Sequence, residues 1–281
     1  MLLFLMMMVS APAQADTTVQ VPTGARLEMN LVDGGVRVTT WAKSTVRVIA
    51  SGGGDAELQV DVSGRRVRVS AQDPDGGPYE GDLELTVPAD LALAISTVSG
   101  DIAVTGSRAD LDLESVEGNV TVEGGSGVVT LHSVSGDVRV AGAKGRIELN
   151  SVDGSISGRG LEGDIKAETV DGEVTLSDVA ATGVDATTVD GNVRLEMVLR
   201  TGGRYRLNSH DGDVTLSVPT LDATVSVSTF SGSFESDFPV TLNSTRGGKR
   251  MDFTVGAGAA SVDLESFDGS IRIEKRTSTS R

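Results

Sequence analysis

The stretch Thr97-Val98-Ser99-Gly100-Asp101-Ile102-Ala103-Val104 contains the pattern that decides the fold. It reads Ser/Thr, apolar, any residue, Gly, a small polar or acidic residue, then apolar-x-apolar, and it recurs along the chain. The central glycines of the copies are Gly100, Gly118, Gly136, Gly154, Gly172, Gly191, Gly212, Gly232 and Gly269. The first four gaps are 18 each, the next three are 19, 21 and 20, and we interpret the last gap, of 37, as two successive turns. A period of about 18 residues predicts a repeat architecture.

Two apolar pairs alternate with polar residues inside each period. Ile102 and Val104 form the first pair, and Leu111 and Leu113 follow half a period later. Alternation with a period of two is typical of strands that bury one face. A second glycine column marks the opposite corner of each turn: Gly106, Gly124, Gly142 and Gly160. The sequence therefore predicts an all-β fold, a single-stranded parallel β-helix or β-solenoid with two short strands per turn. Right-handed coiling follows from the general preference of parallel crossovers.

The rest of the chain is organised around these repeats. Residues 1–15 join an apolar run to Ala13-Gln14-Ala15, which predicts a signal peptide. Residues 16–96 keep the alternation but have irregular turns, as expected of a capping section. Residues 97–275 are predicted to be regular solenoid repeats, and residues 276–281 a disordered tail. All phenylalanines after the signal peptide lie between 230 and 267, so we expect Phe-rich turns to close the C-terminal end of the apolar core.

Charge and cysteine content narrow the function. The formal net charge of −16 argues against a nucleic-acid partner, because phosphate polymers would be repelled. The chain contains no cysteine, so it has neither disulfides nor thiolate metal ligands. After signal cleavage no apolar run approaches the roughly 20 residues that span a bilayer. We expect an exported protein without a cofactor, periplasmic or secreted and associated with the cell surface.

The Ser/Thr-Val-x-Gly-Asp-Val ladder resembles a large bacterial family of unknown function, described as putative adhesins with β-helical structure. Residues 35–41, 85–88 and 256–264 are similar to that family's first strands, its recurrent Val-Pro step and its closing turn. The resemblance covers nearly all of residues 20–275 and brings no catalytic residues with it. It implies a non-enzymatic, adhesin-like binding or scaffold protein of the cell envelope, whose partner is an envelope protein or a glycan.

Acidic residues precede many of the motif glycines: Glu117, Asp153, Asp171, Asp190, Asp211 and Asp268. Asp171 with Glu173, and Asp211 with Asp213, are candidate oxygen ligands for calcium in a structural module. Asp-Gly is also a favoured turn dipeptide, because Asp bonds to local backbone and Gly adopts positive φ. The chain lacks the GGxGxDxUx nonapeptide of calcium-binding β-rolls. Solvated turn acids are therefore the favoured interpretation, and calcium binding stays an alternative.

A polysaccharide-active β-helix enzyme is the other alternative. Asp171 and Asp190 are candidates for its general acid and base. However, any two neighbours of the acidic row would serve equally well, and no long loop is present to build a cleft. The only aromatic residues outside the phenylalanines are Trp41, Tyr79 and Tyr205. The sequence therefore favours a protein that is not an enzyme and has no catalytic residues.

A Ser/Thr column accompanies the motif glycines, beginning with Thr97, Ser115 and Ser133. We expect its hydroxyls to form a ladder of hydrogen bonds with one another and with the corner backbone. The ends of such a solenoid are open sheet edges, which predicts a possible end-to-end homodimer.

Overall fold

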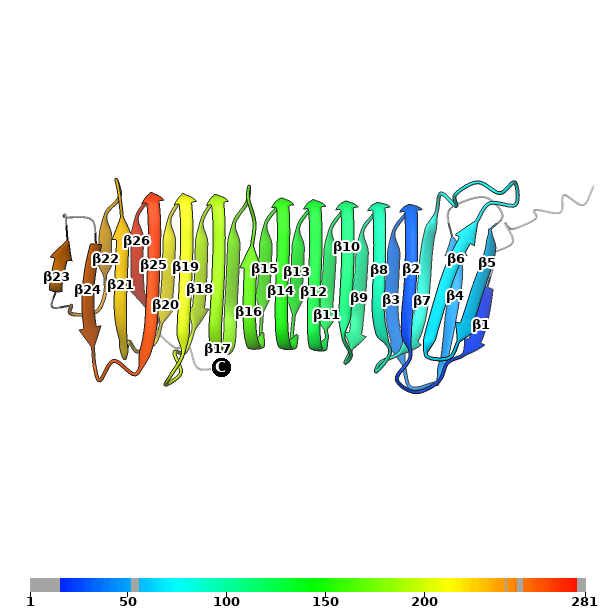
Figure 1. Cartoon of the computed structure of the whole chain (residues 1–281), viewed down its shortest axis with the longest axis horizontal. Helices are drawn as coiled ribbons and strands as arrows, with labels where there is room; N and C mark the ends of the chain where they lie inside the picture. Colours follow the sequence, from blue (N-terminus) through cyan, green and yellow to red (C-terminus); the bar gives the residue numbers. More distant parts are fainter. Residues whose placement is uncertain (1–15, 52–55, 241, 247–249, 277–281) are drawn as a thin grey trace, which may run out of the picture.

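Buried and exposed residues alternate along almost every strand of the computed structural model, which describes residues 16–51, 56–240, 242–246 and 250–276. In β10 (Leu111–Glu117), Leu111, Leu113 and Ser115 are buried and the residues between them are not. Each strand thus supplies one apolar face, and parallel stacking joins these faces into a single continuous core. The chain is an all-β solenoid, elongated along the direction in which the strands stack (Figure 1). The predicted signal peptide lies outside the described residues.

The strands form two facing sheets, named A and B here. In spatial order, sheet B consists of β5 (Glu57–Ser63), β6 (Arg66–Gln72), β2 (Arg26–Asp33), β8 (Ala92–Ser99), β10, β12 (Ser126–Ser135), β14 (Lys144–Asp153), β16 (Glu162–Glu168), the second part of β17 (Val174–Asp190), β19 (Arg204–Asp211), β25 (Ala260–Asp268), β21 (Ala223–Thr229), β24 (Arg250–Val255) and β23 (Leu242–Arg246). Sheet A consists of β1 (Asp16–Gln20), β4 (Thr45–Ser51), β7 (Asp82–Pro88), β3 (Val36–Trp41), β9 (Ile102–Ser107), β11 (Val120–Gly124), β13 (Val138–Ala141), β15 (Ile156–Arg159), the first part of β17, β18 (Val193–Met197), β20 (Val214–Val218), β26 (Ile271–Lys275) and β22 (Phe234–Ser236).

The register between coils follows the sequence repeat. Leu111 pairs with Val129, and Val129 pairs with Ile147, so each pairing joins residues that are one sequence repeat apart. On the other sheet, Val120 pairs with Val138. Equivalent apolar residues therefore lie directly above one another inside the solenoid.

Close backbone contact explains the glycine of the motif. A Cβ atom on Gly136 would lie far inside van der Waals distance of the carbonyl oxygen of Gly118, its equivalent in the neighbouring coil. At the opposite corner, Gly142 and Gly160 have φ values of 70° and 64°, in the left-handed region. Close approach thus explains the glycine at Gly136, and backbone conformation explains the glycines at Gly142 and Gly160.

The Ser/Thr column binds the corner backbone, as predicted. Ser133 Oγ donates to the carbonyl oxygen of Gly118 at 2.8 Å, and Thr169 Oγ1 donates to that of Gly154 at 2.8 Å. Each of these buried hydroxyls therefore pairs with the motif glycine of the adjacent coil, and not with another hydroxyl of the column.

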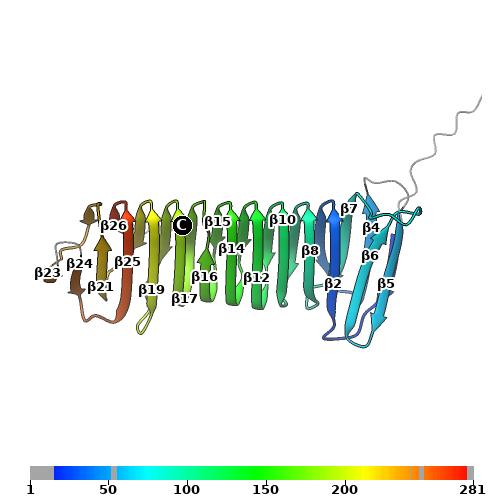
Figure 2. The same ribbon diagram turned by 45° about the horizontal axis from the view of Figure 1, so that its top comes forward.

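Chain order and spatial order differ at both ends of the solenoid. The coil β2–β3 lies between β6–β7 and β8–β9, and the coil β25–β26 lies between β19–β20 and β21–β22. Figures 1 and 2 show this as colours out of sequence: blue β2 stands beside teal β8, and red β25 stands between yellow β19 and orange β21. Our interpretation of the gap from Gly232 to Gly269 as two successive turns was therefore wrong. β23 and β24 form an antiparallel pair, in which β24 also pairs with β21. The chain then places its last coil on the other side of β21.

The structure corrects two further expectations about the C-terminal region. Phe253 is buried, and Phe234 and Phe238 pack against the core as expected of closing rings, but Phe230 and Phe267 lie exposed on the outer surface and do not close it. Arg276, assigned from sequence to a disordered tail, donates its backbone N–H to the carbonyl oxygen of Val218 at 3.0 Å. Its guanidinium reaches Glu196 at 2.7 Å and Asp178 at 3.3 Å. Residues 277–281 lie outside the described residues.

Candidate functional site

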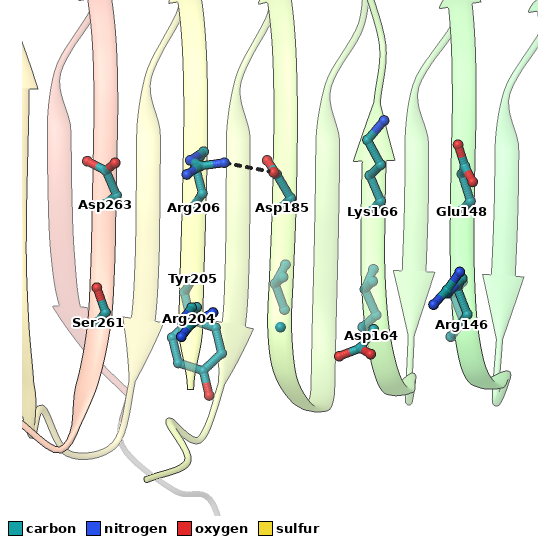
Figure 3. Close-up of a pocket in the computed structure, with 14 residues that line it drawn as sticks. Arg146, Glu148, Asp164, Lys166, Asp185, Arg204, Tyr205, Arg206, Ser261 and Asp263 are labelled. Carbon is teal, nitrogen blue, oxygen red and sulfur yellow. Dashed lines mark hydrogen bonds and ion pairs between the residues drawn. The ribbon is translucent and has the colours of Figure 1, made fainter. Parts of the chain in front are cut away.

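A shallow groove of about 530 Å³ crosses the outer face of sheet B (Figure 3). It runs along the solenoid axis over β14, β16, β17, β19 and β25. The side chains that line it come from outward positions of these strands, so they belong to the polar half of the alternating pattern.

Two rows of side chains form the groove. The first row, in the order of the strands, is Arg146, Asp164, Gly183, Arg204 and Ser261. The second row is Glu148, Lys166, Asp185, Arg206 and Asp263. Because strands in a sheet are about 4.8 Å apart, each row presents a charge pattern at nearly that interval. The second row alternates strictly between acid and base.

The hollow exists because Gly183 has no side chain at the centre of the first row. Residue Thr182 is an insertion relative to β16: Gly163 pairs with Ala181 and Asp164 with Gly183, so the register shifts there. A Cβ on Gly183 would meet only the flexible carboxylate of Asp164, at 3.1 Å. A larger residue is therefore sterically admissible at this position and would fill the groove.

The second row is held by ion pairs. Lys166 Nζ lies 2.8 Å from Glu168 Oε2, and Arg206 Nη1 lies 3.2 Å from Asp185 Oδ2. The hydrogen bond from Lys166 to Glu168 raises the pKa of Lys166 above its ordinary value, and the charges of Glu148 and Asp185 act in the same direction. Lys166 is therefore protonated at neutral pH.

The first row leaves both signs of charge available. Within the described part of the chain, Arg146 and Arg204 form no ion pair, and neither does Asp164 between them. Three strand spacings separate the two arginines, about 14 Å. Guanidinium groups of this kind are suited to bidentate bonds with carboxylates. The groove thus offers two separate cationic contacts with an acidic contact in between.

Tyr205 is buried beneath the groove and supplies no aromatic surface to it. Its hydroxyl accepts a hydrogen bond from the backbone N–H of Arg200 at 2.9 Å and donates to the carbonyl oxygen of Ala181 at 3.1 Å. The ring therefore anchors the loop after β18 and is not available to stack on a ligand.

The acidic residues predicted as calcium ligands lie elsewhere, at the corner between the sheets. Asp171, Glu173, Asp211 and Asp213 are all exposed. Asp213 Oδ1 accepts the backbone N–H of Ser270 at 2.8 Å, and Glu173 Oε1 accepts the hydroxyl of Thr175 at 2.8 Å. Over the described residues, no group of three or more acidic or histidine side chains comes close enough to hold a metal ion. Calcium binding stays a prediction that awaits a direct test.

The structure does bring Asp171 and Asp190 together, as neighbours on adjacent coils. Both side chains are exposed at the corner, and neither lines the groove. A different column, formed by the residues that follow the motif glycines, forms a backbone-capping ladder, in which Asp137 Oδ1 accepts the N–H of Ser155 at 2.8 Å.

Sequence reasoning did not identify the groove. Its charged residues occupy ordinary solvent-facing positions, which look alike in every coil. The only sequence signal was the gap between Gly172 and Gly191, which is slightly longer than the regular period and indicated an insertion without locating it at Thr182.

The fold and this surface define a class: an all-β solenoid whose coils present broad, polar outer faces. No helix long and apolar enough to cross a bilayer occurs in the described ranges. The family model described as Toastrack DUF4097 matches residues 1–160 and, a second time, residues 146–274. The chain belongs to this Toastrack family, a domain family of unknown function, which confirms the resemblance recognised in the repeat.

Solved structures with a related fold are bacterial proteins described as putative adhesins. One from Parabacteroides merdae is 10% identical, with 92% of this chain and 95% of that chain covered and a TM-score of 0.52. One from Bacteroides fragilis is 12% identical, with 94% and 98% covered and a TM-score of 0.37. The first of these likenesses supports the fold alone, and the second is too weak to carry an argument. A comparison with curated proteins found no match.

Proposed function

We propose that this chain is a non-enzymatic, exported binding module of the bacterial cell envelope, and that the groove on sheet B holds an extended polypeptide segment of a partner protein. The proposal includes removal of residues 1–15 as a signal peptide, a periplasmic or surface-associated location, and right-handed coiling. The solved relatives described as adhesins are consistent with a place on the cell envelope.

The mixed charge of the groove is the observation that carries the proposal. Arg146 and Arg204 are unpaired cations, while Asp164 and Glu148 are acids without ion pairs in the described residues. A polypeptide can present both carboxylates and ammonium groups to such a surface. A polyanionic glycan can pair only with the arginines, and the net charge of −16 repels it at long range.

The shape of the groove supports the same class of ligand. It runs across five strands, with its hollow at Gly183 in the middle, so it suits a chain laid along the solenoid axis. An extended polypeptide advances about 3.3 Å per residue, so carboxylates four residues apart lie about 13 Å from each other, close to the spacing of the two arginines. No exposed aromatic ring lines the groove as a platform for a sugar ring.

The experiment is a binding screen with a matched pair of variants. Peptides of mixed charge taken from envelope proteins are titrated against the wild type, against Arg146→Ala/Arg204→Ala, and against Arg108→Ala/Arg194→Ala. The control pair removes the same two charges from exposed positions outside the groove, neither of which forms an ion pair in the described structure. We expect the groove variant to lose at least about tenfold in affinity, as fits loss of charged hydrogen bonds, and the control to stay within about twofold.

Two other results would overturn the proposal. Binding of uronate oligosaccharides in place of peptides would replace the polypeptide by a glycan. Steady turnover of any oligosaccharide, abolished by Asp171→Asn or Asp190→Asn, would make the protein an enzyme.

A further inference from the structure

A ridge of exposed apolar side chains runs along the outer face of sheet B at the corner with the motif glycines, four residues further along each strand than the second row of the groove. We call it the valine ridge; its exposed valines are Val32, Val98, Val116, Val152, Val170 and Val189. The pairing of the flanking residues, such as Leu31 with Thr97 and Asp33 with Ser99, places these valines on successive coils, with the half-buried Val134 on the coil between Val116 and Val152. Their exposed fractions range from 38% at Val116 to 56% at Val32.

Aromatic rings continue the ridge toward the C-terminal end. His210 takes the position of the valine in the next coil, and its ring stacks on Phe267 at 4.9 Å between centroids. From Val32 to Phe267 the ridge spans eight strand spacings, or about 38 Å. A soluble protein rarely leaves so long a continuous apolar strip in water unless the strip contacts a partner.

The spacing of the ridge restricts what can cover its whole length. Its apolar groups repeat at about 4.8 Å. An α-helix repeats one face every turn, about 5.4 Å. An extended strand repeats one face every second residue, about 6.6 Å. The side chains of a helix laid along the ridge are therefore out of register with its apolar groups by half a coil spacing after four coils. Those of an extended strand lose register sooner. A second β-solenoid has the same repeat and stays in register from end to end, and a second copy of this chain meets that condition.

Charge restricts the arrangement of the two copies. On the corner flank of the ridge, the column is mostly acidic: Asp33, Ser99, Glu117, Ser135, Asp153, Asp171, Asp190, Asp211 and Asp268. On the flank toward the groove, the column is mostly neutral: Asn30, Ser96, Glu114, His132, Asn150, Glu168, Thr187, Asn208 and Glu265. The carboxylate of Glu168 in this second column is paired with Lys166.

A two-fold axis parallel to the solenoid axis matches these flanks. It places the acidic column of one copy against the mostly neutral column of the other. An antiparallel arrangement would place acids against acids, which is unfavourable.

The area available is sufficient when both flanks take part. A specific interface buries about 600–1,000 Å² on each partner, and a strip about 38 Å long reaches the lower bound when it is about 16 Å wide. The corner column follows the ridge by one residue, about 3.3 Å, and the other column precedes it by two residues, about 6.6 Å, so the three columns with their side chains give about that width. The groove begins beyond these columns and stays open.

We propose that two copies of this chain associate side by side and in parallel through the valine ridge. This dimer differs from an end-to-end dimer, which would use the sheet edges at β5 or β23. It does not depend on the groove. A protein that dimerises but binds no peptide would support the dimer alone, and a monomer that binds peptide would support the groove alone.

Sedimentation velocity over a range of protein concentrations tests the association, with the exported chain from residue 16 onwards. The test variant is Val116→Thr/Val152→Thr/Val170→Thr, which keeps the β-branched shape and removes apolar surface. The control is Val62→Thr/Val128→Thr/Val198→Thr, because these valines are 40%, 51% and 57% exposed and lie off the ridge. We expect the ridge variant to dimerise at least tenfold more weakly than wild type, the control to stay within twofold, and 1 M NaCl not to weaken the wild-type dimer. A monomeric wild type at several hundred micromolar, or equal weakening in both variants, would overturn the proposal.

Cysteine cross-linking tests the parallel arrangement, since the chain contains no cysteine of its own. Facing sheets lie about 10 Å apart, too far for a direct disulfide, so a short bis-maleimide is the reagent. In a parallel dimer, Val98→Cys, Val152→Cys and Val189→Cys each face the same residue of the other copy, so all three variants should form covalent dimers. Cross-linking confined to Val152→Cys, at the middle of the ridge, would show an antiparallel pair and contradict the arrangement.

Discussion

Ser266 Oγ donates a hydrogen bond to the carbonyl oxygen of Gly212 at 2.8 Å, across 54 residues of sequence. In the regular part of the solenoid the same bond joins residues 15 apart, as between Ser133 and Gly118. The separation is longer because β21 to β24 precede β25 in the chain but lie further from β19 in space. The last coil, β25 with β26, lies between them and β19–β20. The final coil of the chain is therefore an internal coil of the solenoid, which has energetic consequences.

Removal of the last coil should unfold more than the residues removed. In a serial solenoid, a chain that ends at residue 259 would lose only its terminal coil. Here β21 and β22 pair with β25 and β26, so deletion of residues 260–281 also strips the partners from residues 221–240. We expect hydrogen exchange and limited proteolysis to show loss of protection across 221–259 while β12 to β16 stay protected. Retained protection at β21 would contradict the interleaved order.

The Ser/Thr ladder should contribute measurably to stability, except at its first member. Thr169→Val removes the bond to the carbonyl oxygen of Gly154, and we expect a loss of about 1–2 kcal/mol. Thr97 is buried and its hydroxyl has no hydrogen-bond partner in the described structure. Thr97→Val should therefore be neutral or slightly stabilising, because no bond is lost and an unpaired buried hydroxyl is removed. Urea titrations of both variants provide the measurement; equal destabilisation by both would contradict the ladder.

Gly136 and Gly142 should respond differently to alanine. A Cβ on Gly136 points into the carbonyl group of Gly118, so Gly136→Ala requires the coils to move apart, with an expected cost of about 3 kcal/mol or more. Gly142 has a φ of 70° and open space around its Cβ position, so Gly142→Ala costs only the left-handed conformation, about 1–2 kcal/mol. Thermal unfolding should show a larger loss of stability for Gly136→Ala than for Gly142→Ala. A larger loss for Gly142→Ala would contradict the explanation.

Calcium should leave the stability unchanged. Asp213 Oδ1 and Glu173 Oε1 each accept a hydrogen bond, from Ser270 and Thr175, and over the described residues no three acidic or histidine side chains come close enough to hold an ion. We expect the melting temperature to be the same in millimolar calcium and in EDTA. A clear rise with calcium, removed by Asp211→Asn/Asp213→Asn, would instead establish the calcium-binding module considered from the sequence.

Much of the fold could be predicted from the sequence because each coil repeats the same local constraints. The alternation at Leu111 and Leu113, the glycine that allows close approach at Gly118 and the buried hydroxyl of Ser115 agree with one another in the regular copies. Consistent local signals of this kind specify strands and corners without knowledge of distant contacts.

The order of the end coils could not be predicted for the same reason. A repeat pattern specifies which residues face inwards but is nearly identical in neighbouring coils, so Ser266 fits against Ser209 or Thr229 equally well by pattern. Only the length and the antiparallel pairing of the intervening β24 decide that the last coil is inserted between them.

The valine ridge was visible in the sequence as an apolar column, yet its exposure was missed. Because inward and outward residues alternate from Leu113, Ser115 faces the core and Val116 faces the solvent. The same alternation in the last coil places Ser266 inside and Phe267 outside. Phe230 and Phe267 face outwards because their position in the repeat, and not their residue type, decides their exposure.

Peptide binding in the groove is the central claim, and titration of a bound peptide against Gly183→Leu tests it most directly. Leucine at this position fills the groove without changing any charge, since the added Cβ meets only the carboxylate of Asp164. Ser157→Leu, an equivalent change on the exposed face of sheet A, is the control. We predict that Gly183→Leu abolishes peptide binding while the control binds like wild type. Unchanged affinity of the folded Gly183→Leu variant would contradict binding in the groove.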